Sequence, residues 1–173
     1  MKKILIILAL IMITTGCRQK EEPRPQYQFP TGPIQAQDDT KLLREAVQKD
    51  PRNVNAWIKL GNIFMDTSRC NEAIDAYSKA LDIDPKNVDV RVDMGTCYRY
   101  TGRSDRAVEE YRKALKIDPD HLYGHKNLAV VLYYDFSDRN GAITEFKKYL
   151  ELAPNAPDAD QVRQEIQKLE AIK

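Results

Sequence analysis

The sequence has few of the features that mark catalytic or nucleic-acid-binding proteins. Its 173 residues include three cysteines, two histidines and seven glycines. It contains no glycine-rich phosphate loop, nucleophile elbow, haem-attachment motif or catalytic pair of carboxylates. The net charge of +1 at pH 7 comes without a basic excess or an acidic block. We therefore expect no catalytic residues, no cofactor, no small-molecule substrate and no nucleic-acid partner.

The two histidines are the only candidates for a metal site. His121 and His125 are four residues apart, a spacing that can place both on one helix face. Only Asp118 and Asp120 lie near them in the sequence as further ligands. His125 also occupies the position that Trp57 holds in an internal repeat of the chain. We expect structural roles for both histidines and no metal site.

Long hydrophobic runs are also scarce, and the single one lies at the N-terminus. Residues 4–13 are apolar and come after a short basic start. Ten helical residues span about 15 Å, half of a bilayer core, so a retained transmembrane helix is not favoured. Small residues at 14–16 precede Cys17, which is typical of a secretory signal and its cleavage point. We predict a signal peptide over residues 1–16.

The residues around this cleavage point carry a further resemblance. Gly16-Cys17 after an apolar run resembles the lipobox of bacterial lipoproteins, although Thr14 stands where leucine is usual. The resemblance implies that Cys17 is acylated, with palmitate-type chains anchoring the protein in a membrane. Arg18 comes next, where enterobacterial lipoproteins retained in the inner membrane have aspartate. The outer membrane, facing the periplasm, is therefore the expected location, with the inner membrane left open.

Residues 17–37 are predicted to form a tether. The stretch 18–37 contains four of the nine prolines, together with five glutamines. Proline fixes φ and removes a backbone donor, which favours an extended segment. Removal of residues 1–16 takes away Lys2 and Lys3, so 25 basic residues face 26 acidic ones and the mature chain is close to neutral.

The remainder of the chain is an internal repeat. Asp50-Pro51, Asp84-Pro85 and Asp118-Pro119 are 34 residues apart, and Ala153-Pro154 comes after a further 35. The same residue types recur between them in register: Gly61, Gly95 and Ala129; Ala73, Ala107 and Ala142; Tyr77, Tyr111 and Phe146. This pattern resembles the tetratricopeptide repeat (TPR), a helix–turn–helix unit of 34 residues.

The resemblance implies an all-α fold, a right-handed superhelical α-solenoid of about eight helices. The predicted segments are an N-terminal partial-repeat helix at 38–49, repeats at 54–85, 88–119 and 122–154, and a C-terminal capping helix at 158–172.

Gly61 and Gly95 predict close approach of the partner helix. Arg91 stands where repeat one has Trp57, so we expect a looser or more exposed seam there. Repeat three has one inserted residue within 136–141, which predicts a remodelled turn, and Tyr149 is expected to pack on the chain beyond this repeat.

TPR proteins bind an extended peptide or a helix with side chains of the first helix of each repeat. The matching positions here define the expected concave binding face: Asn62, Met65, Thr96, Arg99, Tyr100, Tyr123, Lys126, Val130, Tyr133 and Tyr134. Tyrosine and arginine are enriched at binding hot spots. A carboxylate clamp of the chaperone-binding type is not expected, because Ile58 and Asp93 replace its lysine and one of its asparagines.

Cys70 and Cys97 remain if Cys17 is acylated. They fall near the seam between repeats one and two, where a disulfide would suit an oxidising compartment. The alternative is two buried free thiols, since cysteine is common in cores. The sequence favours the disulfide.

The expected function is that of a non-catalytic, membrane-anchored scaffold or adaptor that helps to assemble an envelope complex. Two alternatives stay open: a periplasmic chaperone for c-type cytochrome maturation, and a regulator of a cell-wall enzyme. The sequence does not identify the partner.

Overall fold

The computed structural model describes residues 33–171, and their side chains from Asp39 onward. The predicted signal peptide, the lipidation site Cys17 and residues 17–32 of the predicted tether lie outside the described residues. Among the helices within residues 33–171, none is both long enough and apolar enough to cross a membrane.

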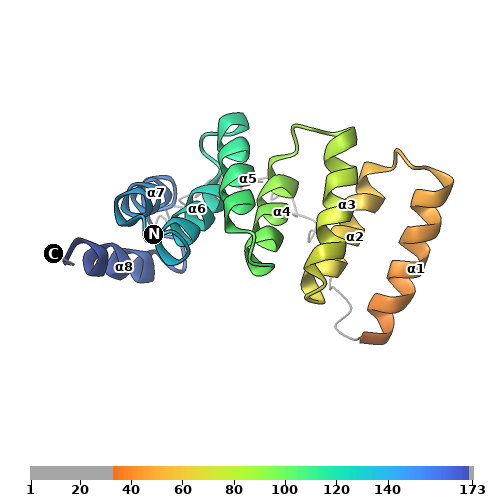
Figure 1. Cartoon of the computed structure of the whole chain (residues 1–173), viewed down its shortest axis with the longest axis horizontal. Helices are drawn as coiled ribbons and strands as arrows, with labels where there is room; N and C mark the ends of the chain where they lie inside the picture. The colour runs from red at the N-terminus through yellow and green to blue at the C-terminus, as the bar shows by residue number, and fades with distance from the viewer. Residues whose placement is uncertain (1–32, 172–173) are drawn as a thin grey trace, which may run out of the picture. The chain divides into compact units, whose positions relative to one another are not determined.

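The part of the chain that the structure describes contains eight α-helices and no strand (Figure 1). Their bounds are α1 Pro33–Lys49, α2 Val54–Asp66, α3 Cys70–Ile83, α4 Val88–Tyr100, α5 Ser104–Ile117, α6 Leu122–Tyr134, α7 Arg139–Leu152 and α8 Ala159–Ala171. The predicted all-α fold of about eight helices is confirmed.

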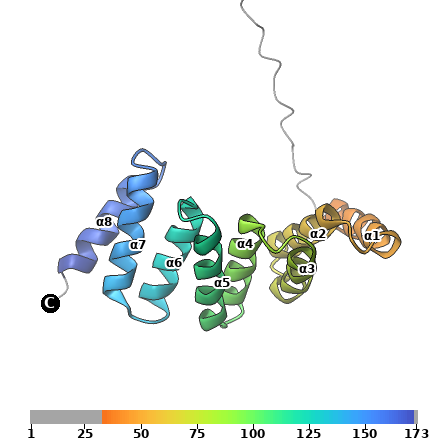
Figure 2. The same cartoon turned by 90° about the horizontal axis from the view of Figure 1, so that it is seen from above.

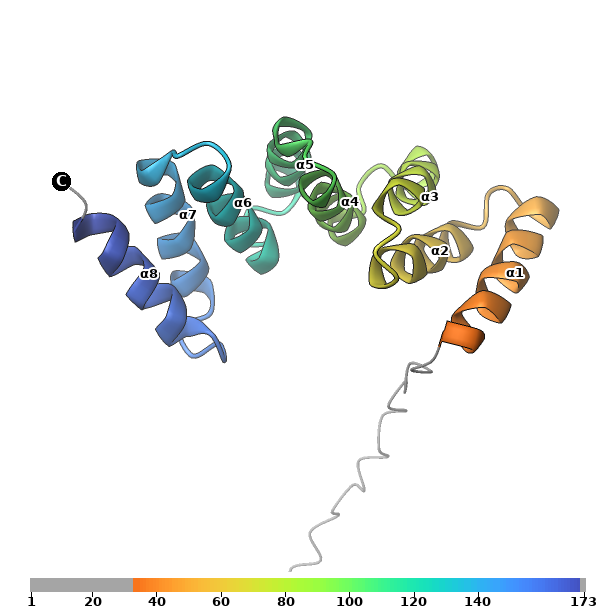
Figure 3. The ribbon, with the colours of Figure 1, turned by 60° about the horizontal axis from the view of Figure 1, so that its bottom comes forward.

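Each helix packs against the next in chain order (Figures 2 and 3). The pairs α2/α3, α4/α5 and α6/α7 are the three predicted repeats, and these pairs have the most extensive contacts. Contacts of α3 with α4 and of α5 with α6 join one repeat to the next, while α1 packs on α2 and α8 on α7. The first helices of repeats two and three, α4 and α6, also touch directly.

The recurring Asp-Pro pairs form the turns between repeats. The side chain of Asp50 accepts a hydrogen bond from the backbone N–H of Arg52 at 3.0 Å. Asp84 and Asp118 accept the equivalent bonds, at 3.3 and 3.1 Å. Three residues later a polar side chain caps the next helix by accepting from its backbone, and the capping residues are Asn53, Asn87 and His121. The Asp-Pro pairs that recur every 34 residues therefore form the same hydrogen-bonded turn each time.

The repeated glycines allow the two helices of a repeat to approach closely. A Cβ added at Gly61 would lie 2.3 Å from the ring of Tyr77, and one at Gly95 would lie 2.7 Å from the ring of Tyr111. Both rings are almost fully buried. The predicted close approach is confirmed, and it explains why glycine is kept in a helix interior, where it costs about 1 kcal/mol relative to alanine.

The buried residues form two hydrophobic clusters. Cluster 1 runs from α1 through repeat one to α4, and includes Leu60, Phe64 and Tyr77. Cluster 2 runs from α4 to α8, and includes Tyr111 and Phe146. The ring of Tyr98 on α4 packs against both clusters. One helix therefore links the two halves of the core.

Two expectations about the repeats are corrected. Helix α1 begins at Pro33 rather than at residue 38, so residues 33–37, which were predicted as part of the tether, are helical. Proline suits the first helical position because its missing N–H would have no partner there. The seam at Arg91 is not loose: Arg91 Nη1 lies 2.7 Å from Glu110 Oε2, and Glu110 is buried.

The three residues at the Trp57 position share one contact despite their different chemistry. Trp57 Nε1, Arg91 Nη2 and His125 Nε2 each donate a hydrogen bond to the carbonyl oxygen of the proline six residues earlier, at 2.8–3.0 Å. Arg91 and His125 also reach a glutamate on the second helix of their repeat, Glu110 and Glu145 respectively. The side chain at the Trp57 position therefore connects the Asp-Pro turn to the repeat that comes after it.

Repeat three departs from the other two as expected. Four residues separate α6 from α7, whereas three separate α2 from α3 and α4 from α5. The turns retain a positive φ at equivalent positions, Ser68, Gly102 and Ser137. The hydroxyl of Tyr149 donates to Asp158, just before α8, which confirms the contact predicted for this tyrosine.

Candidate functional site

We use the name A-helix face for the side chains that α2, α4 and α6 contribute to the predicted binding surface. The structure brings side chains of neighbouring first helices together. Asn127 Nδ2 on α6 lies 3.3 Å from Thr96 Oγ1 on α4. Met65 on α2 and Tyr100 on α4 line the same cavity. The first helices of successive repeats therefore form one continuous surface.

Three tyrosines are the exposed aromatic residues of this face. Tyr100, Tyr123 and Tyr134 are 70%, 58% and 61% exposed. Tyr134 has two contacts: its ring meets that of Tyr133 edge-on at 4.8 Å, and its hydroxyl lies 3.1 Å from Glu165 on α8. Partial desolvation and the bond to Glu165 raise the pKa of Tyr134. Tyr100 and Tyr123 are freer to meet a partner, since Tyr134 is partly committed to the C-terminal helix.

Other predicted members of the face support the core. The side chain of Asn62 accepts a hydrogen bond from the buried hydroxyl of Tyr77 at 2.8 Å. Thr96 Oγ1 lies 3.1 Å from the hydroxyl of Tyr111 on the second helix of the same repeat. Burial raises the pKa of Tyr111 to about 12 and also raises that of Tyr77. Val130 packs against cluster 2. These side chains therefore contact the core and support the A-helix face from below, rather than offering a large area to a partner.

The two cations of the face are already paired. Arg99 holds Asp135 through two bonds, at 3.0 and 3.1 Å. Burial tends to raise the pKa of Asp135, but the bonds from Arg99 and Ser104 outweigh it and the pKa is lowered. Lys126 pairs with Asp158, whose pKa is lowered chiefly by that bond. Neither cation is available to an acidic ligand without breaking an ion pair.

The first helices of repeats one and two also carry three aspartates on this side, and the structure shows that their charges interact. Asp66 ends α2, while Asp89 and Asp93 lie one turn apart on α4. Burial, then the charges of Asp89 and Asp66, raise the pKa of Asp93 to about 6, and His121 opposes the shift. His121 Nε2 donates to Asp89 Oδ1 at 2.9 Å while its Nδ1 accepts from the backbone of Gly124. The sequence places Asp89 and Asp93 four residues apart on one helix, but the approach of Asp66 from α2 depends on how the two repeats stack.

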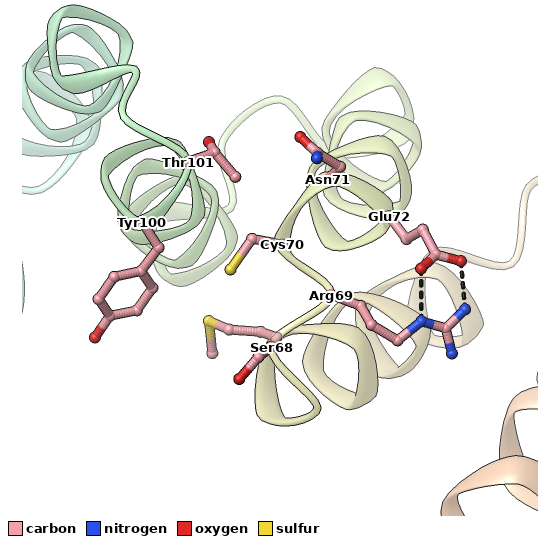
Figure 4. A pocket seen from close by; sticks show the side chains of 8 residues that line it. Ser68, Arg69, Cys70, Asn71, Glu72, Tyr100 and Thr101 are labelled. Carbon is pink, nitrogen blue, oxygen red and sulfur yellow. Dashed lines mark hydrogen bonds and ion pairs between the residues drawn. The ribbon is translucent and has the colours of Figure 1, made fainter.

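A cavity adjoins this face where repeat one meets repeat two (Figure 4). Its volume is about 520 Å³. Its lining comes from the end of α2, the α2–α3 turn, the start of α3 and the end of α4: Met65, Ser68, Arg69, Cys70, Asn71, Glu72, Tyr100 and Thr101. In Figure 4, Tyr100 and Thr101 stand on one side, while Cys70 and Asn71 stand on the other. The sequence did not predict this cavity, because it depends on how two repeats stack.

The disulfide favoured by the sequence is not present. Cys70 and Cys97 are both buried free thiols. They belong to the same hydrophobic cluster, and the structure corresponds to the alternative in which cysteine acts as a small apolar side chain. Burial raises the pKa of Cys97, and its interaction with the Cys70 thiol adds to the shift.

Within residues 33–171 no group of three or more histidine, cysteine, aspartate or glutamate side chains has a geometry suited to a metal ion. His121 caps α6, and His125 occupies the Trp57 position, between Glu145 and the Pro119 carbonyl. Both histidines have structural contacts of the kind expected.

Comparison with known proteins agrees with this architecture. No curated protein sequence matched. A solved structure of MamA has 20% sequence identity and a TM-score of 0.66, and the alignment covers 75% of this chain and 81% of that one. The first TPR domain of Spaghetti (RPAP3), bound to the HSP90 peptide SRMEEVD, has 20% identity and a TM-score of 0.64, covering 71% and 97% of the two chains. At these identities the likeness concerns the fold.

A family model described as the cytochrome c-type biogenesis protein H TPR domain matches residues 35–160. This range includes α2 to α7 and all three repeats. The chain belongs to the tetratricopeptide repeat family, as a member of the cytochrome c-type biogenesis protein H TPR domain group.

Proposed function

We propose that this protein is a non-catalytic adaptor that binds a segment of another protein along the A-helix face. The exposure of Tyr123 on α6, and of Tyr100 beside a cavity, is the observation that carries the proposal. A tyrosine brings a large apolar ring and a polar hydroxyl at a small entropic cost, which suits it to a binding hot spot. Asn62, Thr96 and the paired cations around these rings hold the face in place before a partner arrives.

Site-specific photocrosslinking tests this proposal. A photoreactive residue at Tyr100 would be compared with one at Arg112, an exposed residue of α5 outside the A-helix face. We expect one dominant partner to be captured from position 100 and not from position 112, as identified by mass spectrometry. Equal capture from the two positions would contradict binding at this face.

The membrane anchor is a second part of the proposal. The apolar run over residues 4–13 and Gly16-Cys17 support cleavage before Cys17, acylation of its thiol and amine, and attachment to the bacterial outer membrane. Mass spectrometry of the mature N-terminal peptide would show the acyl chains. The variant Cys17→Ser should lose them and leave the membrane fraction. Retention of this variant in the membrane would contradict the anchor.

A role in c-type cytochrome biogenesis is the more specific candidate, and the family match favours it. On this view the bound segment belongs to a protein of that process, such as an apocytochrome before haem attachment. Deletion of the gene should then lower the haem-stained c-type cytochromes of the cell, and the double variant Tyr100→Ala/Tyr123→Ala should fail to restore them. Normal cytochrome levels in the deletion strain would favour another envelope complex, including a cell-wall enzyme.

A further inference from the structure

The charge of the A-helix face differs between its two ends. Over α6 and the segment leading to α8, acidic groups are neutralised by cations, as in Lys126–Asp158 and Arg99–Asp135. Between α2 and α4 the face has Asp66, Asp89 and Asp93 instead. Asp89 has an almost fully exposed side chain, and Asp66 is exposed.

Within the described residues, these three carboxylates lack a lysine or arginine partner. Of the basic residues that the structure describes, none forms an ion pair with Asp66 or Asp93, and Asp89 is bonded only by His121. Elsewhere on the solenoid some carboxylates are paired with cations, as Glu110 is with Arg91. The α2–α4 end of the face therefore carries negative charge that the described part of the chain does not balance.

The three carboxylates also lie close enough for their charges to interact. The raised pKa of Asp93 has burial as its main cause, with repulsion from Asp89 and Asp66 as the next. Like charges on a partly desolvated surface destabilise one another, and a cation placed among them removes that repulsion. A positively charged side chain from outside would thus gain more here than at an isolated surface carboxylate.

A cavity with two large apolar side chains in its lining lies next to this charge. Met65, beside Asp66, lines the 520 Å³ cavity together with Tyr100. On α4, Tyr100 lies seven positions after Asp93, which corresponds to about 10 Å along the helix axis. An extended peptide covers that distance in about three residues. The spacing fits a peptide with a basic residue and an apolar residue about three positions apart.

We propose that the A-helix face binds a cationic, extended segment of a partner protein, with a lysine or arginine against Asp66, Asp89 and Asp93 and an apolar side chain at the Met65–Tyr100 cavity. This inference rests on the proposed function and adds the chemistry of the partner. It also separates this chain from the Spaghetti domain, whose peptide SRMEEVD carries two glutamates and a C-terminal aspartate. Such a peptide would bring negative charge against the three aspartates.

Peptide binding measured by fluorescence anisotropy tests the proposal. The full chain in a neutral detergent would be titrated with three labelled ten-residue peptides that share the same apolar residues and differ only in carrying lysine, glutamine or glutamate. We expect the lysine peptide to bind at least tenfold more tightly than the glutamate peptide. Its affinity should fall as salt rises from 50 to roughly 300 mM, since exposed charges are screened.

Variants then assign the effect to the three aspartates. Asp66→Asn/Asp93→Asn should weaken the lysine peptide about tenfold or more and leave the glutamine peptide unchanged. Asp75→Asn, which removes an exposed carboxylate of α3, is the matched control and should change neither. Circular dichroism of each variant would check the fold.

The outcomes separate this inference from the proposed function. Equal affinity for the three peptides, with binding lost in Tyr100→Ala, would overturn the charge preference and leave the A-helix face as the binding surface. Tighter binding of the glutamate peptide would overturn it in the same way. No binding of the lysine peptide would also overturn it, while the crosslinking at position 100 would independently decide whether the face binds a protein.

Discussion

At the scale of single residues, the same position performs one task with different chemistry. Trp57, Arg91 and His125 each donate to the carbonyl of a preceding proline. An indole, a guanidinium and an imidazole are interchangeable here because each offers an N–H at a similar reach. Arg91 replaces the aromatic residue that is usual at this position in the family, but this replacement does not loosen the seam.

Asp93 provides a prediction at this scale. Its pKa in the folded protein is about 6, above the ordinary value of 3.8, so protonation favours the folded state. The stability of the natural protein should therefore gain from a fall in pH between about 7 and 4. Asp93→Asn removes the charge and should stabilise the protein at pH 7.5, by at most about 3 kcal/mol.

Thermal unfolding of Asp93→Asn and the natural protein at several pH values would check this. The advantage of the variant should shrink as the pH falls through 6 and vanish near 4. Asp75→Asn should show no such pH-dependent advantage, because Asp75 is exposed on α3. A variant advantage that is the same at pH 7.5 and pH 4 would rule out the buried charge of Asp93 as its source.

At the scale of elements, ion pairs between helices replace apolar packing in repeat two. Arg91 on α4 and Glu110 on α5 are both largely buried, and Arg91 Nε is buried without a hydrogen-bond partner among the described residues. Lys113 also contacts Glu110, at 2.9 Å. A buried pair of this kind fixes the relative position of two helices while contributing little net stability.

Arg91→Met should therefore destabilise the fold by about 2 kcal/mol, because it leaves the Glu110 carboxylate buried. This is below the usual 3–5 kcal/mol for a stranded charge, since Lys113 still contacts Glu110. The double variant Arg91→Met/Glu110→Leu should recover most of the loss. Urea unfolding would measure all three proteins, and an equally unstable double variant would contradict this account of the seam.

At the scale of the whole molecule, the described residues behave as a linear stack. Each helix contacts mainly its neighbours in sequence, and the core is divided into two clusters linked through α4. In such a stack, cooperativity depends on the interfaces between units. Tyr98, which packs against both clusters, is the side chain best placed to transmit that coupling.

Tyr98→Ala should uncouple the two clusters. Trp57 is the only tryptophan and packs against cluster 1, so its fluorescence reports that half, while circular dichroism reports all helices. In the natural protein the two urea transitions should coincide. In Tyr98→Ala they should separate, or the transition seen by circular dichroism should broaden. Coincident transitions in both proteins would show that other contacts of α4 carry the coupling.

The sequence by itself determined the repeat, the number of helices and the small-against-aromatic packing of each pair. These depend on periodicities that are local in the chain, such as glycine at 61 and 95 facing Tyr77 and Tyr111. It also predicted that Tyr100 and Tyr123 belong to the A-helix face, because a repeat transfers a position from one unit to the next, and both side chains are exposed.

Only the tertiary structure decided how that face is charged. Arg99 pairs with Asp135, 36 residues away, and Lys126 pairs with Asp158, 32 residues away. Asp66 and Asp93 instead repel each other across a seam where the described residues place no lysine or arginine partner. Coulomb interactions depend on distances between side chains of different repeats, and those distances come from the stacking of helices rather than from any local pattern.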